Sequence, residues 1–342
     1  MIEAKQKVVR RFWHCVMPIA RLEQGPQPFT LLGERLVLWL DDTGTPVAMA
    51  DRCCHRTARL SRGWCEGALI VCGYHGWAYD RTGKCVRIPQ QPDSAIPSGA
   101  KVPSYRCEAR YGYAWVALEE PLLPIPHLPE AGAEGFRQVD QFYEPWNCSG
   151  IRFMENAFDF AHQSFVHSAM QGLRDKPVPP RGEIVDRDYG FDMNIVQPVR
   201  NPDSGKKHLK IDADETVRTV DLNWFMPFSR RMGITYPTGL RQSIYSVATP
   251  IDEGRCQVIQ WSYRNDSEAD VPAADIIAFD RAVVDEDRLI LEAVDGDMPL
   301  DTRRRAEFHM DSDRPGLLMR RKLLELLARH GEVEVGGIGR AG

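Results

Sequence analysis

Two segments, Asp51-Arg-Cys-Cys-His-Arg56 and Cys72-Gly-Tyr-His-Gly-Trp-Ala-Tyr-Asp80, decide the fold of the first third of this 342-residue chain. Each segment places a cysteine ahead of a histidine, as C-x-H in the first and C-x-x-H in the second, and sixteen residues separate the two motifs. Thiolate and imidazole groups bind iron, zinc or copper, so the ligand types alone do not choose the metal. Four such side chains in two loops predict a metal centre.

The order of the ligands narrows this choice. A Cys2His2 zinc site usually pairs like ligands, with C-x-x-C before H-x-x-x-H. In this chain Cys53 and His55 share one loop, and Cys72 and His75 share the other. Two cysteines can then bind one iron of a 2Fe–2S cluster while two histidines bind the other iron, which is the ligand set of a Rieske centre. A zinc-stabilised binding module is one alternative, and buried cysteines with structural histidines are another.

A second motif follows about eighty residues later, as Asn156-x-x-Asp159-x-x-His162 and then His167. The two histidines are five residues apart, or about 140° around an ideal helix, so binding one metal needs a helix distortion or a helix end between them. Asp159 lies one turn before His162 and can accept a hydrogen bond from its ring. Two histidines and a carboxylate are the ligands of mononuclear Fe(II) sites. The alternative is a helix with two buried histidines and no metal.

A third ligand is expected on a long amphipathic helix over residues 273–294. On a helical wheel Asp287 falls near the centre of an apolar stripe, and Asp285 and Glu292 fall on the opposite face. A carboxylate inside a buried stripe is costly unless it is paired or bound to metal. Asp280, seven residues earlier, lies on the same stripe and is the competing candidate. The apolar members of the stripe are Ile276, Val283, Ile290, Leu291 and Val294.

The bulk composition predicts a folded protein of about two domains, because 43% of its residues are hydrophobic and 27% are charged. A net charge of −5 argues against nucleic acid as a partner. The sequence has no apolar run of membrane-spanning length, so a soluble protein with no membrane partner is expected. Arg10-Arg11 ahead of a short apolar stretch could be a twin-arginine signal, but His14 and Pro18 favour a first strand of the fold and a cytoplasmic protein.

Nine cysteines, an odd number, argue against a disulfide framework in a reducing compartment. We expect the seven outside the two metal loops to be small buried side chains. These seven are Cys15, Cys54, Cys65, Cys85, Cys107, Cys148 and Cys256.

The pattern of turns and apolar runs predicts an all-β domain over residues 8–120, a Pro-rich linker over 121–134 and a mixed domain over 135–335. In the first domain we expect strands at 36–40, 46–50, 69–72 and 113–118. In the second we expect a helix near 152–170 and then strands of an antiparallel sheet at 219–225, 231–236, 241–250 and 255–263. The helix at 273–294 and a last helix at 314–329 follow, and residues 336–342 are expected to fray.

The two motifs together resemble the Rieske non-haem iron oxygenases. The loops at 51–56 and 72–80 are similar to the cluster loops of that family, although Cys54 and Gly73 stand where relatives often carry proline. The stretch from Met154 to His167 resembles the iron-binding helix, and Glu286-Asp287-x4-Glu292 resembles the stretch that holds the third ligand. The resemblance covers about residues 8–330. It favours Asp287 over Asp280, and it places Asn156 near the iron, where a plain hydrogen-bonding role is equally compatible with the residue.

The resemblance implies an α+β fold: an N-terminal Rieske 2Fe–2S all-β domain followed by a helix-grip (START-like) catalytic domain with an antiparallel sheet and a mononuclear Fe(II) site. It also implies a head-to-tail homotrimer, since within one subunit the two metal sites would be too far apart for fast electron transfer. His75 of one subunit would then face Asp159 of the next, which would bridge to His162.

The family also implies a function. An NAD(P)H-dependent reductase or a ferredoxin would supply electrons, and O₂ would be the oxidant; no Rossmann fingerprint is visible, so NAD(P)H is not expected to bind this chain. The single chain resembles the homotrimeric dicamba and vanillate O-demethylase and caffeine N-demethylase branch, which implies monooxygenation of a small aromatic or heterocyclic compound, foremost as O- or N-demethylation. Ring hydroxylation or cis-dihydroxylation is the first alternative, and a Rieske electron carrier with a non-catalytic second domain is the second. Pocket-lining candidates are Trp224, Phe225, Phe228 and Tyr236, for which a core role is the competing interpretation.

Overall fold

The computed structural model describes residues 5–168, 170–296 and 298–335. The chain divides into two compact units, and the first comprises Lys7–Ile125 together with Thr249–Glu253. The second comprises Pro126–Ala248 and Gly254–Gly342, with Met1–Gln6, as far as these ranges are described. The segment Thr249–Glu253 thus lies in the second half of the chain but belongs to the first unit. Domain bounds predicted as continuous stretches of sequence do not anticipate this. None of the described helices is long and apolar enough to cross a membrane.

The first unit consists of two antiparallel sheets. A six-stranded sheet has the order β1-β10-β9-β4-β3-β2, and a four-stranded sheet has the order β5-β6-β7-β8. Short helical turns occur at Lys7–Arg11, Ile19–Leu22 (α1) and Leu60–Arg62. The strands are β1 (His14–Pro18), β2 (Gln27–Leu31), β3 (Glu34–Leu40), β4 (Pro46–Ala50), β5 (Trp64–Glu66), β6 (Leu69–Val71), β7 (Ala78–Tyr79), β8 (Cys85–Arg87), β9 (Ser104–Arg110) and β10 (Tyr113–Ala117).

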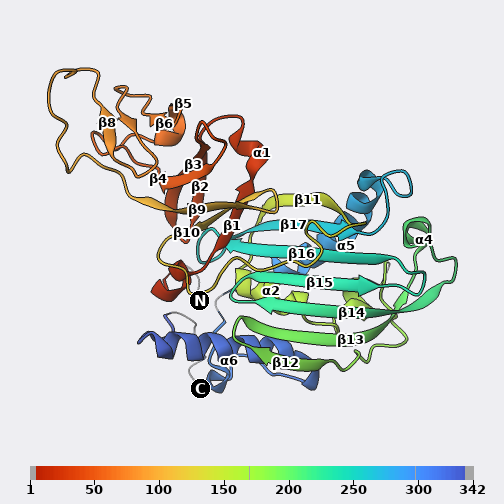
Figure 1. Cartoon of the computed structure of the whole chain (residues 1–342). Helices are drawn as coiled ribbons and strands as arrows, with labels where there is room; N and C mark the ends of the chain where they lie inside the picture. Colours follow the sequence, from red (N-terminus) through yellow and green to blue (C-terminus); the bar gives the residue numbers. More distant parts are fainter. Residues whose placement is uncertain (1–4, 169, 297, 336–342) are drawn as a thin grey trace. The chain divides into compact units, whose positions relative to one another are not determined.

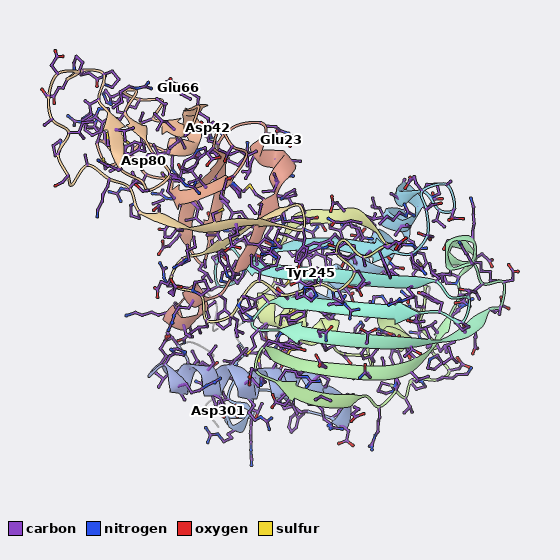
Figure 2. The ribbon with its side chains drawn as sticks, in the orientation of Figure 1. Glu23, Asp42, Glu66, Asp80, Tyr245 and Asp301 are labelled. Atoms are coloured by element: carbon purple, nitrogen blue, oxygen red, sulfur yellow. The ribbon has the colours of Figure 1, made fainter. Side chains whose placement is uncertain are left out.

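Tight turns hold the small sheet in shape. Asp80, labelled with Glu66 in Figure 2, accepts hydrogen bonds from the backbone and hydroxyl of Thr82, so its side chain closes the turn between β7 and β8. Gly83 has a φ of +82°, and a Cβ at this position would lie 1.9 Å from the carbonyl oxygen of Val102. Only glycine fits this position. These turns position β7, which directly follows the second Cys-His loop.

The second unit is built on one large antiparallel sheet. The strands β12 to β17 follow one another as a meander, and β11 pairs with β17 at the far edge. The strands are β11 (Arg137–Trp146), β12 (Glu183–Arg187), β13 (Gly190–Arg200), β14 (Glu215–Phe225), β15 (Ser229–Thr235), β16 (Arg241–Pro250) and β17 (Cys256–Arg264). Buried aromatic residues pack along the sheet: the rings of Tyr245, labelled in Figure 2, and Trp261 lie 4.5 Å apart.

Helices cover this sheet and line its β12 edge (Figure 1). The long helix α5 contacts β11 and α2, and α6 runs beside β12, where Lys322 donates a hydrogen bond to the carbonyl oxygen of Arg187. The helices are α2 (Gly150–Ala157), α3 (Gln163–Val166), α4 (Asp203–Leu209), α5 (Ala273–Leu291) and α6 (Arg314–Arg329), with 3-10 turns at Thr302–Arg304 and Asp311–Asp313. Mostly antiparallel sheets in both units, with helices against the second, confirm the predicted α+β class.

Most of the elements predicted from periodicity are present at nearly the predicted bounds. β4, β16 and α6 match residue for residue, and the first strand begins at His14. Three expectations need correction. Of the seven cysteines expected to be buried, Cys54 is exposed, and Cys65 and Cys107 are only partly buried. The expected helix over 152–170 is two shorter helices, α2 and α3, separated by five residues. In the predicted apolar stripe Ile290 is exposed, as is Val294, which lies beyond the end of α5 at Leu291. The expected fraying of residues 336–342 lies outside the described residues.

Candidate metal centres and active site

Three side chains of the second unit converge on one point. Nε2 of His162 lies 3.3 Å from Nε2 of His167, and Oδ1 of Asp287 lies 3.4 Å and 3.2 Å from these two nitrogens. A point equidistant from three atoms at such spacings is about 2 Å from each, which is the usual length of a bond from a divalent metal to nitrogen or oxygen. Among the described residues, these three form a group with the donor atoms and spacing to hold one metal ion.

The break between α2 and α3 brings the two histidines together. α2 ends at Ala157, and the side chain of Asp159 accepts a hydrogen bond from the backbone of Ala161 at 2.7 Å, which competes with helical bonding in this stretch. His162 and His167 then directly precede and follow the one-turn helix α3. Two helices therefore replace the expected continuous one. The first, α2, ends ahead of His162, and the one-turn helix α3 lies between His162 and His167.

The site is electrostatically suited to a cation. Burial alone would raise the pKa of Asp287, but the neighbouring imidazoles hold it well below its ordinary value. Burial would lower the pKa of His162, yet the hydrogen bond to Asp159 and the nearby Asp287 raise it to about 9. Oδ1 of Asp287 is buried and accepts no hydrogen bond from a described residue. A divalent metal would satisfy this oxygen and displace the proton from the histidine pair, so the residues present fit a metal ion.

Each histidine is oriented from behind by a carboxylate. Nδ1 of His162 lies 3.1 Å from Oδ2 of Asp159, as expected from the sequence, and Nδ1 of His167 lies 2.9 Å from Oε2 of Glu286. Such contacts fix the ring so that Nε2 is free to bind metal. The sequence pattern alone assigns no role to Glu286, and the signal that points to it is its position next to Asp287.

We expect Glu286→Gln to weaken Fe(II) affinity by about 10- to 100-fold, because the amide no longer supports the ligand basicity of His167. Competition with a metal chelator measures this affinity directly. Asp285→Asn is the matched control, since Asp285 is an exposed neighbour on α5 that pairs with Arg281. An equal loss of affinity in both variants would contradict the role of Glu286.

Asp280, the competing third ligand, lies outside this group. It is 8% exposed and accepts hydrogen bonds from the side-chain amides of Gln141 and Gln242. Asp280 lies seven residues before Asp287, which is two helical turns closer to the start of α5 and about 10 Å away. Among the described residues, the atoms that converge with the two histidines thus come from Asp287.

The four predicted cluster ligands lie together in the first unit. The imidazole rings of His55 and His75 are 4.6 Å apart and lie toward the surface, whereas Cys53 and Cys72 are buried. Oη of Tyr79 lies 3.0 Å from Sγ of Cys53. Buried sulfurs beneath partly exposed imidazoles fit a two-iron cluster with an inner and an outer iron.

The two cluster loops have the same backbone construction. The amide of Thr57 donates to the carbonyl oxygen of Cys53, and the amide of Gly76 donates to that of Cys72, with φ values of 59° and 70°. Burial and the neighbouring Cys53 raise the pKa of the Cys72 thiol, while the backbone N–H groups of Tyr74 and His75 act in the opposite direction. Amides aimed at sulfur stabilise a thiolate and tune a bound cluster.

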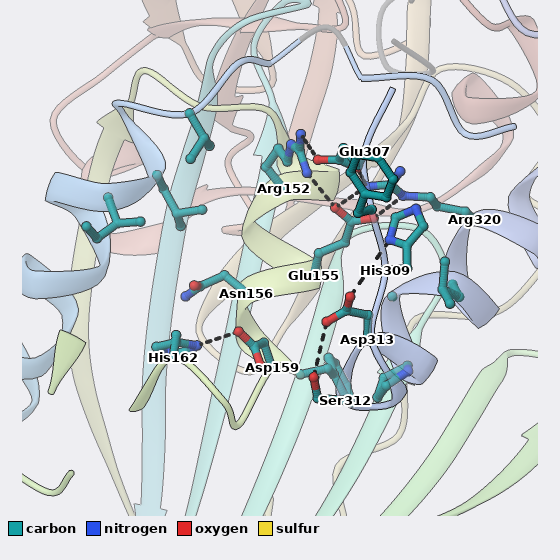
Figure 3. Close-up of a pocket in the computed structure, with 18 residues that line it drawn as sticks. Arg152, Glu155, Asn156, Asp159, His162, Glu307, His309, Ser312, Asp313 and Arg320 are labelled. Atoms are coloured by element: carbon teal, nitrogen blue, oxygen red, sulfur yellow. Dashed lines mark hydrogen bonds and ion pairs between the residues drawn. The ribbon is translucent and has the colours of Figure 1, made fainter. Parts of the chain in front are cut away.

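Two cavities share Asn156, Asp159 and His162 among their lining residues. One, of about 310 Å³, is lined by Asn156, Asp159 and His162 and extends to the segment 307–320 (Figure 3). The other lies between α5 and the sheet and is lined by all of His162, His167 and Asp287. Tyr236 also lines this second cavity, whereas three other aromatic candidates are not among its lining residues. These are Trp224 and Phe228, which are buried in the core, and Phe225.

Comparison with known families matches both units. Residues 12–106 match the Rieske [2Fe-2S] domain, and residues 146–329 match the vanillate O-demethylase oxygenase C-terminal domain. The first domain implies a 2Fe–2S cluster, and oxygenases of the second type use a mononuclear iron. The cofactors predicted from the sequence are therefore confirmed at the level of the family.

Individual relatives extend over nearly the whole chain. The methylxanthine N1-demethylase NdmA of Pseudomonas putida is 30% identical over 97% of this chain and 93% of its own length. The solved structure of NdmA with caffeine covers 96% of this chain and 94% of that chain, with a TM-score of 0.82 and 28% identity. Dicamba monooxygenase bound to dicamba has a TM-score of 0.80 at 22% identity, covering 94% of this chain and 98% of that one, which shows the shared fold. The chain therefore belongs to the Rieske non-haem iron oxygenases with a catalytic domain of the vanillate O-demethylase type.

Proposed function

We propose that this chain is the terminal oxygenase of a Rieske monooxygenase system that removes a methyl group from nitrogen or oxygen of a small aromatic or heterocyclic compound. The observation that carries this proposal is the cavity between α5 and the sheet, which all three members of the His162–His167–Asp287 group line. A metal held by three protein ligands keeps open positions, and here they would face this cavity. The demethylase relatives support methyl removal as the reaction.

We assign the metal ligands accordingly. Cys53 and Cys72 would hold one iron of the cluster, and His55 and His75 the other. His162, His167 and Asp287 would hold the mononuclear iron, which supplies the activation of O₂. The protein binds and orients the substrate and excludes water from the cavity.

Asp159 and Asn156 have supporting roles in this proposal. Asp159 orients His162 and lines the 310 Å³ cavity, and we propose it as the entry point for electrons. Burial would raise the pKa of Asp159, but the hydrogen bond with His162 holds it below its ordinary value, so the carboxylate stays charged. Asn156 lines both cavities, and we propose that its amide positions a water or the substrate near the iron.

The proposed assembly is a head-to-tail homotrimer in which the cluster of one subunit donates electrons through Asp159 of the next. Two separate surfaces support it. Exposed Tyr74 and Trp64 lie near the cluster loops, and exposed Phe308 and Ile290 line the cavity beside Asp159. Exposed large apolar side chains around a functional opening are typical of interaction surfaces. The electron donor would be an NAD(P)H-dependent reductase or a ferredoxin.

Cytoplasmic location and domain bounds complete the proposal. None of the nine cysteines, all of which lie in the described residues, forms a disulfide, and the sulfurs of Cys148 and Cys256 stay 3.8 Å apart, which favours a reducing compartment. We propose 8–120 as the Rieske domain, 121–134 as the linker and 135–335 as the catalytic domain.

The test is a reconstituted assay with a Rieske-system reductase, NADH, O₂ and a panel of N-methyl and O-methyl aromatic compounds. The proposal predicts one formaldehyde and one demethylated product for each NADH consumed productively. A hydroxylated ring product without formaldehyde would favour ring hydroxylation, and cluster reduction without any product would favour an electron carrier.

A further inference from the structure

The cluster region of the first unit differs in charge from the rest of the chain. Residues 51–101, which contain both cluster loops and the four-stranded sheet, hold eight basic and four acidic residues, a net charge of +4. The whole chain has a net charge of −5, so the remaining residues together carry −9. A basic region in an acidic chain attracts an acidic partner and speeds its association.

Four arginines gather this charge at the cluster loops. Arg52, Arg56, Arg59 and Arg62 are all exposed and lie within eleven residues of sequence, and we call them the arginine patch. The first two directly flank the Cys53–His55 motif. The patch therefore begins at the first cluster loop.

The patch also reaches the second loop and an exposed histidine. The carbonyl oxygen of Arg62 would lie 2.8 Å from a Cβ at Gly73, so the backbone of Arg62 packs against the second loop. Burial, the neighbouring His75 and Arg56 together lower the pKa of His55, which places Arg56 within electrostatic reach of that imidazole. The positive charge thus acts where an electron can reach the outer side of the cluster.

Carboxylates of the same chain compensate this charge poorly. Among the described residues, Arg52, Arg56 and Arg62 pair with no carboxylate, and only Arg59 does so, with Asp51 at 3.5 Å. Guanidinium groups bind carboxylates through two parallel hydrogen bonds, so unpaired arginines are suited to acidic side chains of another molecule.

A second copy of this chain fits the patch poorly. The proposed subunit contact joins exposed apolar side chains, and at the cavity beside Asp159 the nearby acidic residues already have partners. Glu155 and Glu307 pair there with Arg152 and Arg320. These carboxylates are not available to further arginines, so the patch points to a different partner.

We propose that the arginine patch docks the electron donor, and that this donor is an electron-transfer protein or reductase domain with acidic side chains around its own redox centre. One electron leaves the reduced donor and enters the oxidised cluster, and no bond forms or breaks. The charge complementarity guides the donor to the cluster and sets its orientation. This inference rests on the proposed function and names the class of partner that supplies its electrons.

A plant-type [2Fe–2S] ferredoxin with an acidic surface is the probe, since its potential lies below that of Rieske centres. Binding of the oxidised ferredoxin to the oxidised holoenzyme is measured by calorimetry. Reduced ferredoxin is then mixed with oxidised holoenzyme in the absence of oxygen and substrate, and cluster absorption follows the electron. For wild type we expect the second-order rate constant to fall at least about 10-fold between about 50 mM and about 500 mM salt.

Variants locate the docking surface. Arg52→Gln/Arg56→Gln is expected to weaken ferredoxin binding and to slow cluster reduction by at least about 10-fold each, and to remove most of the salt dependence. Arg106→Gln/Arg110→Gln is the matched control, because it removes two exposed charges from β9 of the same unit. Its binding and rate should stay within about twofold of wild type.

The methyl viologen radical cation separates docking from a changed cluster potential. This reductant is positively charged, so the loss of Arg52 and Arg56 should leave its rate unchanged or raise it while the ferredoxin rate falls. A fall for both reductants would assign the effect to the cluster potential and overturn the docking site. No reduction by ferredoxin, a rate independent of salt, or an equal loss in the control variant would also overturn it. Dissociation of the subunits of Arg52→Gln/Arg56→Gln in sedimentation would do so in favour of a subunit contact.

These outcomes are distinct from those of the demethylation assay. The expected charge dependence, with no formaldehyde from any methylated compound, would overturn the demethylase function alone. Formaldehyde release with salt-independent cluster reduction would overturn only the docking site.

Discussion

Replacing Asp287 by alanine is expected to strip the mononuclear iron from the protein and to lower turnover by at least about 1,000-fold. Oδ1 of Asp287 is the carboxylate oxygen within 3.4 Å of both histidine nitrogens, so the variant keeps two ligands of three. Iron analysis and the reconstituted assay measure the two effects. The visible absorption of the 2Fe–2S cluster should be unchanged, because its proposed ligands belong to the other unit.

Asp280→Ala is the matched control for this experiment. Asp280 is also a buried carboxylate on α5, and the account predicts that its removal leaves the iron content at the wild-type level. Iron that is lost from Asp280→Ala and kept in Asp287→Ala would reverse the ligand assignment.

Asp159→Asn is expected to lower turnover by about 100-fold in protein reloaded with Fe(II) so that both metals are bound, since the amide weakens Fe(II) affinity here as it does at Glu286. Asparagine has the same shape, and its carbonyl oxygen can still accept from Nδ1 of His162, so the ring keeps its orientation. The proposed electron path requires the negatively charged carboxylate of Asp159, which this substitution removes. Reducing the cluster with dithionite and then following its reoxidation with substrate and O₂ isolates this step from the reductase.

Asp313→Asn serves as the control, since Asp313 lines the same cavity and pairs with His309 (Figure 3). Its cluster should reoxidise at the wild-type rate. A wild-type rate in Asp159→Asn, with full iron content, would remove Asp159 from the electron path.

The local sequence predicted those parts of the fold that depend on local patterns. The strand β16 and the helix α6 have clean periodicity and clear ends, and both were located residue for residue. The helix bounds within 152–170 were not located in this way, because the helix is interrupted where the side chain of Asp159 accepts a hydrogen bond from the backbone of Ala161. Helix propensity does not register such a competing hydrogen bond.

The candidate site illustrates the same limit. A helical wheel placed Asp280 and Asp287 on one stripe, but it cannot say which end of that stripe meets the histidines. It also did not anticipate that Ile290 is exposed. The role of Glu286 depends on where His167 lies in space.

The measurement that tests the central claim most directly is the content of iron and acid-labile sulfide per chain in protein purified without oxygen. The account predicts three irons and two sulfides, since one cluster and one mononuclear site are present. Two irons and two sulfides that persist after reconstitution with Fe(II) would contradict the mononuclear site and leave an electron carrier. Zinc without sulfide would contradict both metal centres.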